Sequence, residues 1–386
     1  MTFEYAERIK RLPPYLFAEI EKIIKEKKAQ GVDLISLSIG DPDLPPPQFV
    51  VEALKQEAAN PKNHNYSFSQ GEPDFREAVA GWYKKRFNVD LAQDQVIALL
   101  GSKEGIANIA RAFVNPGDRV LVPDPAYPVY ANGSTILCDG TVVPMPLLEE
   151  NGFQPDLEAV DARRVKMMFL NYPNNPTAAT ADKKFLKQAV DFAKDNNVIL
   201  CYDNAYSEIT YDGYRAPSIL EVDGAMDVAI EFHSLSKTFN MTGDRIGFAV
   251  GNKQLVSGLT KIKSQIDSGP PVYTQKVAVK ALAAYTGEEA PEFLKKNNQI
   301  LQERRDLLVE TLCKIGFQCV KPKATFYVWV NCRGDSMKFA TKLLDVGVAV
   351  TPGIGFGKCG EGYVRITFTQ PKERILEACN RISSAF

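Results

Sequence analysis

The stretch VKMMFLNYPNNP, residues 165–176, is followed closely by DKKFLKQAVDFAKDNN (182–197) and NVILCYDNAYSE (197–208). The first and third segments begin with apolar runs of strand length that do not alternate with polar residues, as is typical of strands buried on both faces. The middle segment has the periodicity of an amphipathic helix. Further apolar runs occur in QVIALLG (95–101), DRVLVPDPAYP (118–128), GTVVPMPL (140–147), DVAIEFHSLSK (227–237) and RIGFAVGN (245–252). This order predicts an α/β fold with a doubly wound, mostly parallel sheet.

The pattern changes after residues 264–275, SQIDSGPPVYTQ. A long charged helix is predicted within residues 288–316, and the alternating strands TFYVWVNC (325–332) and GYVRITFT (362–369) follow it. We therefore expect a large domain over residues 46–280 and a smaller α+β domain over residues 281–386. Residues 1–45 are expected to form an N-terminal arm and part of the small domain.

Composition narrows the possible functions. The 386 residues include 46 basic and 47 acidic side chains, and this net charge of −1 gives no field that would attract nucleic acid or an anionic membrane. The apolar runs are shorter than the roughly 20 residues of a membrane span. Seven cysteines without a CxxC pair and a charged N-terminal segment predict a cytoplasmic protein. His64 and His233 are far apart in the sequence and have no ligand spacing, so no metal site is expected.

Polar residues follow the predicted strands, where an open parallel sheet binds its ligands. They include a carboxylate, Asp203, an amine, Lys237, and an arginine, Arg245. Pyridoxal 5′-phosphate requires this set, because its aldehyde needs an amine, its ring nitrogen a carboxylate, and its phosphate an arginine, hydroxyls and a helix N-terminus. The sequence therefore predicts a pyridoxal-phosphate enzyme.

The chain also resembles the class I aminotransferases of pyridoxal-phosphate fold type I. The resemblance rests on SIGDPDL (38–44), YSFSQGEPDFREAV (66–79), GSKEG (101–105), DPAYPVY (124–130), NYPNNPT (171–177), YDNAYSEI (202–209), SLSKTFNMTGDRIG (234–247) and YVRITF (363–368). Within that family, the sequences LPPYLF, GSKEGIA and NYPNNPT are most similar to those of the LL-diaminopimelate aminotransferase group.

The resemblance implies a role for each matching residue. Lys237 would form the Schiff base and move the proton, Asp203 would pair with the ring nitrogen, and Arg365 would bind the substrate α-carboxylate with help from Gly40. The other implied cofactor contacts are Asn175 and Tyr206 to the ring hydroxyl, Tyr127 on the ring face, Ser102, Lys103, Ser234, Ser236 and Arg245 around the phosphate, and Tyr66 from the second subunit of a homodimer. Tyr15 and Lys103 are expected at the distal end of the substrate, and Asn175 also near the substrate.

The implied reaction is a ping-pong transfer of an amino group between an amino acid and a 2-oxo acid, with LL-2,6-diaminopimelate and 2-oxoglutarate as the expected pair. An aminotransferase for alanine, aspartate or aromatic amino acids, or a β-lyase, remains an alternative. SLSK also matches the S-x-x-K pattern of serine acyl-enzymes, but the partner motifs S-D-N and K-T-G are absent from the sequence. Two residues depart from the family pattern, Ala178 in place of a glycine and Asp244 in place of an aromatic residue.

Overall fold

A computed structural model describes residues 3–14 and 16–386 of the chain. Its centre is a seven-stranded sheet in the order β2-β8-β7-β6-β5-β3-β4. Only β8 runs antiparallel to its neighbours, β7 and β2. The strands are β2 (Val96–Leu99), β3 (Arg119–Asp124), β4 (Thr141–Pro146), β5 (Val165–Asn171), β6 (Ile199–Asp203), β7 (Ala229–Ser234) and β8 (Gly247–Gly251). The predicted α/β fold with a mostly parallel sheet is confirmed.

Successive residues of the central strands pack into different apolar cores. In β5, Met167 and Phe169 belong to one core, while Met168 and Leu170 belong to the other. Side chains alternate across a strand, so both faces of this sheet are covered. The lack of polar alternation in the sequence follows from this double burial.

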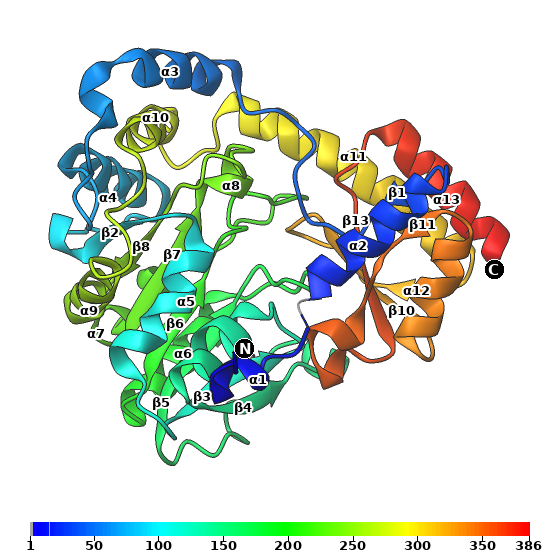
Figure 1. Cartoon of the computed structure of the whole chain (residues 1–386), viewed down its shortest axis with the longest axis horizontal. Helices are drawn as coiled ribbons and strands as arrows, with labels where there is room; N and C mark the ends of the chain where they lie inside the picture. The colour runs from blue at the N-terminus through cyan, green and yellow to red at the C-terminus, as the bar shows by residue number, and fades with distance from the viewer. Residues whose placement is uncertain (1–2, 15) are drawn as a thin grey trace.

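Helices cover both faces of the sheet, as Figure 1 shows. The helix predicted at 182–197 is α6 (Lys183–Asp195), and Asp182 caps it by accepting the N–H of Phe185. The other helices around the sheet are α3 (Gln48–Ala59), α4 (Pro73–Phe87), α5 (Ser102–Phe113), α7 (Ala225–Val228), α8 (Leu235–Thr238), α9 (Lys253–Lys263) and α10 (Val272–Ala283). A seven-residue π-helix, η3 (Val129–Thr135), follows β3.

A second, smaller sheet has the order β12-β13-β10-β9 and is antiparallel. It lies beside the long helix α11 and the helices α12 and α13 (Figure 1). Its strands are β9 (Gln318–Cys319), β10 (Tyr327–Asn331), β12 (Thr351–Pro352) and β13 (Tyr363–Thr367), and the helices are α11 (Glu292–Lys314), α12 (Ser336–Asp345) and α13 (Lys372–Ala385).

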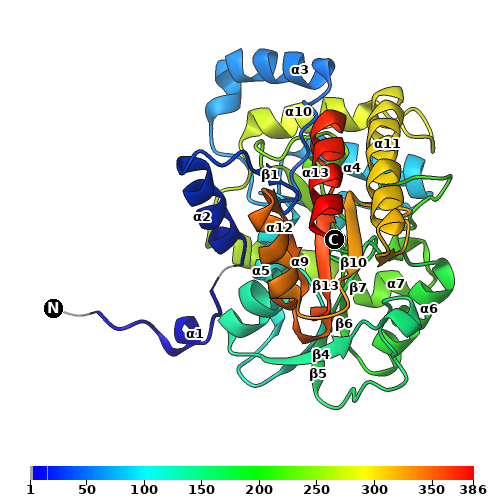
Figure 2. The same ribbon diagram turned by 90° about the vertical axis from the view of Figure 1, so that its right-hand side faces the viewer.

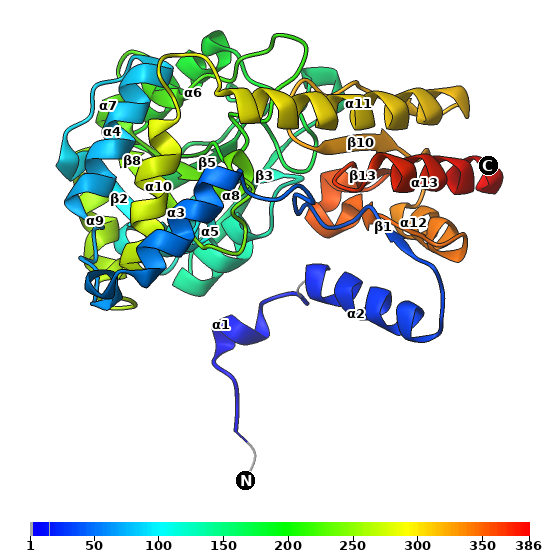
Figure 3. The same cartoon turned by 90° about the horizontal axis from the view of Figure 1, so that it is seen from above.

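The N-terminal segment forms a separate two-stranded sheet with β11 (Val348–Ala349), and its first described residues extend away from the body. β1 (Ile35–Ser36) pairs in parallel with β11. Helix α2 (Leu16–Ala29) packs Ile20 and Ile24 against Leu34 and Ala349. Helix α1 (Glu7–Lys10) and residues 3–6 project outward, as Figures 2 and 3 show.

In the part of the chain that the structure describes, no helix is long and apolar enough to cross a membrane. The same residues contain no cluster of histidine, cysteine and acidic side chains that could hold a metal ion.

Candidate active site

A cavity of about 340 Å³ opens where the strands of the large sheet end and the small sheet approaches. Of the predicted site residues that the structure describes, it brings together all except Tyr66. The lining residues are Glu21, Ile39, Gly40, Asp41, Gly101, Ser102, Lys103, Tyr127, Tyr130, Asn171, Asn175, Asp203, Ala205, Tyr206, Ser234, Ser236, Lys237, Thr242, Arg245, Tyr327 and Arg365.

Polar residues at the ends of the parallel strands line the cavity, because the carboxyl ends of these strands lie at one edge of the sheet. Asn171, Asp203 and Ser234 are the last residues of β5, β6 and β7. Ser234 caps the short helix α8 by accepting the N–H of Ser236 at 3.2 Å. This cap starts the turn that carries Lys237 into the cavity.

Lys237 is the buried amine of the site. Its Nζ donates to the carbonyl oxygen of Gly40 at 3.1 Å. Burial lowers the pKa of Lys237 to about 8, the carboxylate of Asp41 opposes this shift, and the cations Arg245 and Arg365 add to it. A larger fraction of this amine is therefore neutral at physiological pH than of an ordinary lysine, which favours nucleophilic and general-base chemistry.

Asp203 is a buried carboxylate that makes two hydrogen bonds. Its Oδ2 accepts the O–H of Tyr130 at 2.8 Å, and its Oδ1 accepts the N–H of Ala205 at 3.3 Å. Burial raises the pKa of Asp203 to about 6, although both hydrogen bonds act in the opposite direction. A cation placed against this carboxylate would restore its ionisation.

An anion-binding corner lies at the start of α5. Ser102 is the first residue of this twelve-residue helix, whose N-terminal N–H groups and dipole favour negative charge. Arg245 donates to the carbonyl oxygens of Thr242 and Leu100, both at 2.8 Å. Gly101 has a φ of 81°, and a Cβ there would lie 2.5 Å from the Arg245 guanidinium. Glycine therefore lets the cation approach the helix N-terminus.

The guanidinium of Arg365 is buried and lines the same cavity. It donates to Asn175 Oδ1 at 2.7 Å and to the carbonyl oxygen of Ser38 at 2.6 Å. It also lies over the rings of Tyr327 at 4.3 Å and Phe356 at 4.8 Å from each centroid. These contacts fix the planar group, as bidentate carboxylate binding requires.

The remaining predicted residues divide into three groups. Tyr206 shares a 2.8 Å hydrogen bond with the hydroxyl of Tyr327, and Lys103 Nζ lies 5.7 Å from the Tyr127 ring centroid. Tyr66 is 91% exposed and does not line this cavity. Tyr15 lies outside the described residues.

The two departures from the family pattern have different surroundings. Ala178 adopts a left-handed backbone conformation, with a φ of 59°. Asp244 is partly buried, and burial raises its pKa. No ion pair joins it to Arg245 among the described residues, because the guanidinium binds backbone carbonyls instead.

Several cavity residues were not predicted from the sequence. Tyr130 and Tyr327 contact the predicted residues Asp203 and Tyr206 through their hydroxyls. Asp41 and Glu21 add carboxylates from the N-terminal segment. The motifs DPAYPVY and SIGDPDL contained Tyr130 and Asp41, but neither position follows directly on a strand of the large sheet.

Comparisons with known proteins agree along the whole chain. The profile described as "Aminotransferase class I and II" matches residues 32–382. The chain is 52% identical to the LL-diaminopimelate aminotransferase of Desulforudis audaxviator, over 99% of this chain and 98% of that protein. The corresponding enzyme of Aquifex aeolicus is 51% identical, with 99% of each chain covered.

Solved structures with the same fold match the chain over nearly its whole length. Aspartate aminotransferase from Thermus thermophilus with maleate superposes with a TM-score of 0.92 at 29% identity, covering 100% of both chains. Substrate-bound BacF from Bacillus subtilis superposes with a TM-score of 0.93 at 36% identity, covering 100% of this chain and 98% of that one.

Proposed function

The chain belongs to the aminotransferase class I and II family and is a pyridoxal-phosphate-dependent aminotransferase, and we propose that it exchanges amino groups between LL-2,6-diaminopimelate and 2-oxoglutarate. The observation that carries the choice of substrate is the identity of about half of all residues with LL-diaminopimelate aminotransferases over the full length.

The cavity fits the cofactor at three separate points. The α5 N-terminus, Ser102 and Arg245 would hold the phosphate, and Gly101 leaves no side chain between them. Asp203 retains acceptor capacity for a protonated ring nitrogen. Lys237 supplies the amine. In this proposal Asn175 and Tyr206 contact the ring hydroxyl, Tyr127 packs on the ring face, and Lys103, Ser234 and Ser236 complete the phosphate site.

The bound cofactor supplies an electron sink for the carbanion that forms when the substrate loses its Cα proton. Lys237 would act as the base that removes the Cα proton of the substrate and holds it for return. Its lowered pKa suits that task, since a base works best when its pKa is close to the working pH. The carboxylate of Asp203 would pair with the protonated ring nitrogen when the cofactor is bound.

Arg365 positions the substrate. Its guanidinium would bind the α-carboxylate in a bidentate pair, with the backbone of Gly40 beside it. Lys103, which lines the same cavity, would face the distal end of the substrate. The resemblance assigns Tyr15 to that end as well. The two fixed ends hold Cα next to Lys237.

The test is the absorbance spectrum of the purified holoenzyme after separate additions of LL-diaminopimelate, L-glutamate, L-alanine, L-aspartate and an aromatic amino acid. LL-diaminopimelate and L-glutamate should each convert the cofactor to its amine form, because both serve as donors in a ping-pong reaction. Conversion by alanine, aspartate or the aromatic amino acid, without conversion by LL-diaminopimelate, would replace the proposed substrate. Release of ammonia and pyruvate from a cysteine conjugate would identify a β-lyase instead.

We also propose that the enzyme is a homodimer in the cytoplasm. Tyr66 is 91% exposed, Phe3 is 88% exposed, and the N-terminal segment projects from the body (Figure 3), as expected for parts that pack on a second copy. Seven unpaired cysteines support a reducing compartment. Sedimentation of the holoenzyme tests the dimer. A mixture of Tyr66→Phe and Lys237→Ala subunits should regain activity only if Tyr66 acts across the interface.

A further inference from the structure

Tyr130 occupies an uncommon backbone conformation next to the cofactor site. It lies in the π-helix η3, and π-helical turns are rare and occur frequently at functional sites. Its carbonyl oxygen accepts the hydroxyl of Thr135 at 2.8 Å, and its ring stacks on Phe169 with a centroid separation of 5.2 Å. These contacts hold the phenol ring in one position. Tyr127 lies just before η3, and its ring centroid is 6.1 Å from that of Tyr130.

The phenol hydroxyl points at Asp203. It donates to Oδ2 at 2.8 Å, and both side chains are buried. The second hydrogen bond to this carboxylate, from the Ala205 N–H, is longer at 3.3 Å. Burial and the neighbouring carboxylate raise the pKa of Tyr130 well above its usual value, so the hydroxyl stays protonated and remains a donor at every working pH.

We propose that Tyr130 is a positioning residue that keeps Asp203 ionised and oriented for the cofactor's ring nitrogen. The inference rests on the proposed role of Asp203. Without the hydroxyl, the carboxylate would keep its burial but lose its shortest hydrogen bond. Its protonated form would then be favoured, and a protonated Asp203 cannot accept a hydrogen bond from the ring nitrogen at the oxygen that carries the proton.

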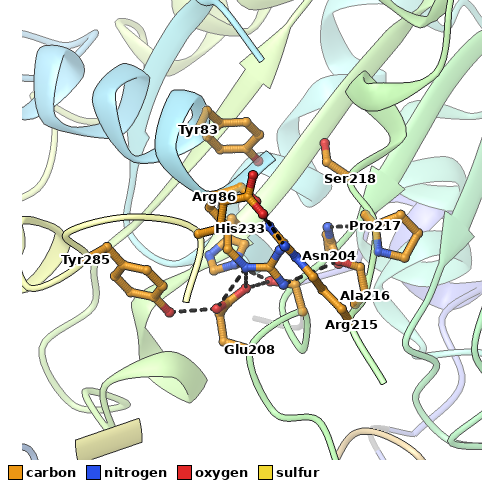
Figure 4. Close-up of polar contacts among 12 residues, drawn as sticks. Tyr83, Arg86, Asn204, Glu208, Arg215, Ala216, Pro217, Ser218, His233 and Tyr285 are labelled. Carbon is orange, nitrogen blue, oxygen red and sulfur yellow. Dashed lines mark hydrogen bonds and ion pairs between the residues drawn. The ribbon is translucent and has the colours of Figure 1, made fainter. Parts of the chain in front are cut away.

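The chain offers a matched control in Tyr83. This tyrosine is also buried, and its hydroxyl donates to Glu231 Oε1 at 2.8 Å, the same distance to the same kind of group. It belongs to a buried polar network with Asn204 and Ser218, both of which also donate to Glu231. Figure 4 shows Tyr83, Asn204 and Ser218 in the same region of the molecule. Tyr83→Phe therefore removes an equivalent hydrogen bond without touching Asp203.

The experiment measures binding of two ligands to the cofactor-free enzyme between pH 5 and 8. One is pyridoxal 5′-phosphate, and the other is its carbocyclic analogue, in which a C–H group replaces the ring nitrogen. Both carry the aldehyde and the phosphate, so the ratio of their dissociation constants isolates the interaction at the ring nitrogen. In the wild type, the preference for pyridoxal phosphate should decline as the pH falls through about 6, the pKa of Asp203.

Tyr130→Phe should move this decline upward by about one pH unit, which reduces the preference about tenfold on the acidic side. Tyr83→Phe should leave the decline in place. An unmoved decline in Tyr130→Phe, or equal weakening of both ligands, would overturn the inference. Asp203→Asn distinguishes failure of the inference from failure of the proposed function. If Asp203→Asn leaves the preference for pyridoxal phosphate unchanged, the proposed role of Asp203 is wrong. If Asp203→Asn changes this preference but Tyr130→Phe does not, only the role of Tyr130 is wrong.

Discussion

The pKa of Lys237 allows a direct test of the site's electrostatics in the cofactor-free enzyme. Burial lowers this pKa from the ordinary 10.5 to about 8. At pH 7 about one amine in eleven would be neutral, compared with about one in 3,000 for an ordinary lysine, a difference of about 300-fold. The neutral amine is the nucleophile, so Lys237 should react far faster than its burial alone would suggest.

The assay is acetylation of Lys237 by a trace of acetic anhydride across pH 6–11, measured by mass spectrometry with exposed lysines as internal standards. Reactivity should be half-maximal near pH 8. Asp41→Asn should lower that midpoint, because the Asp41 carboxylate favours the charged amine. A Glu26→Gln variant, which neutralises a carboxylate on α2 that does not line the cavity, is the control and should not move the midpoint.

The same shift makes a prediction for stability. Because burial depresses the pKa of Lys237, its protonation destabilises the folded protein; this cost is complete below about pH 8 and disappears as the pH rises to 10.5. Lys237→Met should therefore stabilise the cofactor-free protein more at pH 7 than at pH 10.5. In the acetylation assay, a midpoint above pH 10 would refute the lowered pKa of Lys237, and an unchanged midpoint in Asp41→Asn would refute the influence of the Asp41 carboxylate on it.

Three further changes test other parts of the site. Asp203→Asn should retain cofactor at saturating concentration but reduce kcat at least 100-fold, because the ring nitrogen loses its charged partner. A near-normal kcat in steady-state assays would contradict this. Arg365→Lys should lower kcat/KM about 100-fold for both substrates, or ~3 kcal/mol, because lysine cannot form the bidentate pair. Steady-state kinetics with each substrate measures this loss. A loss confined to one substrate would argue against α-carboxylate binding. Ala178→Gly should stabilise the protein by up to ~1 kcal/mol, since the φ of 59° disfavours a Cβ, and a lower Tm in calorimetry would contradict that reasoning.

Local sequence determined the sheet and much of the site. The unbroken apolar runs of β5 and β6 indicated strands with both faces covered, because each strand carries alternate side chains into two cores. Residues at the ends of such strands, among them Asp203 and Ser234, then had to lie at one edge of the sheet. This argument needs only short-range periodicity and the rule that parallel strands end together.

Tertiary structure decided the contacts between distant segments. Tyr130 meets Asp203 73 residues later in the chain, and Arg365 binds Asn175 across 190 residues. Glu21 enters the cavity because Ile20 and Ile24 anchor α2 beside β11. The left-handed backbone of Ala178 is likewise absent from any local pattern, since alanine has no preference for it. Sequence periodicity specifies which face of an element is buried, but the partner on the other side of that face is chosen only when the elements pack together.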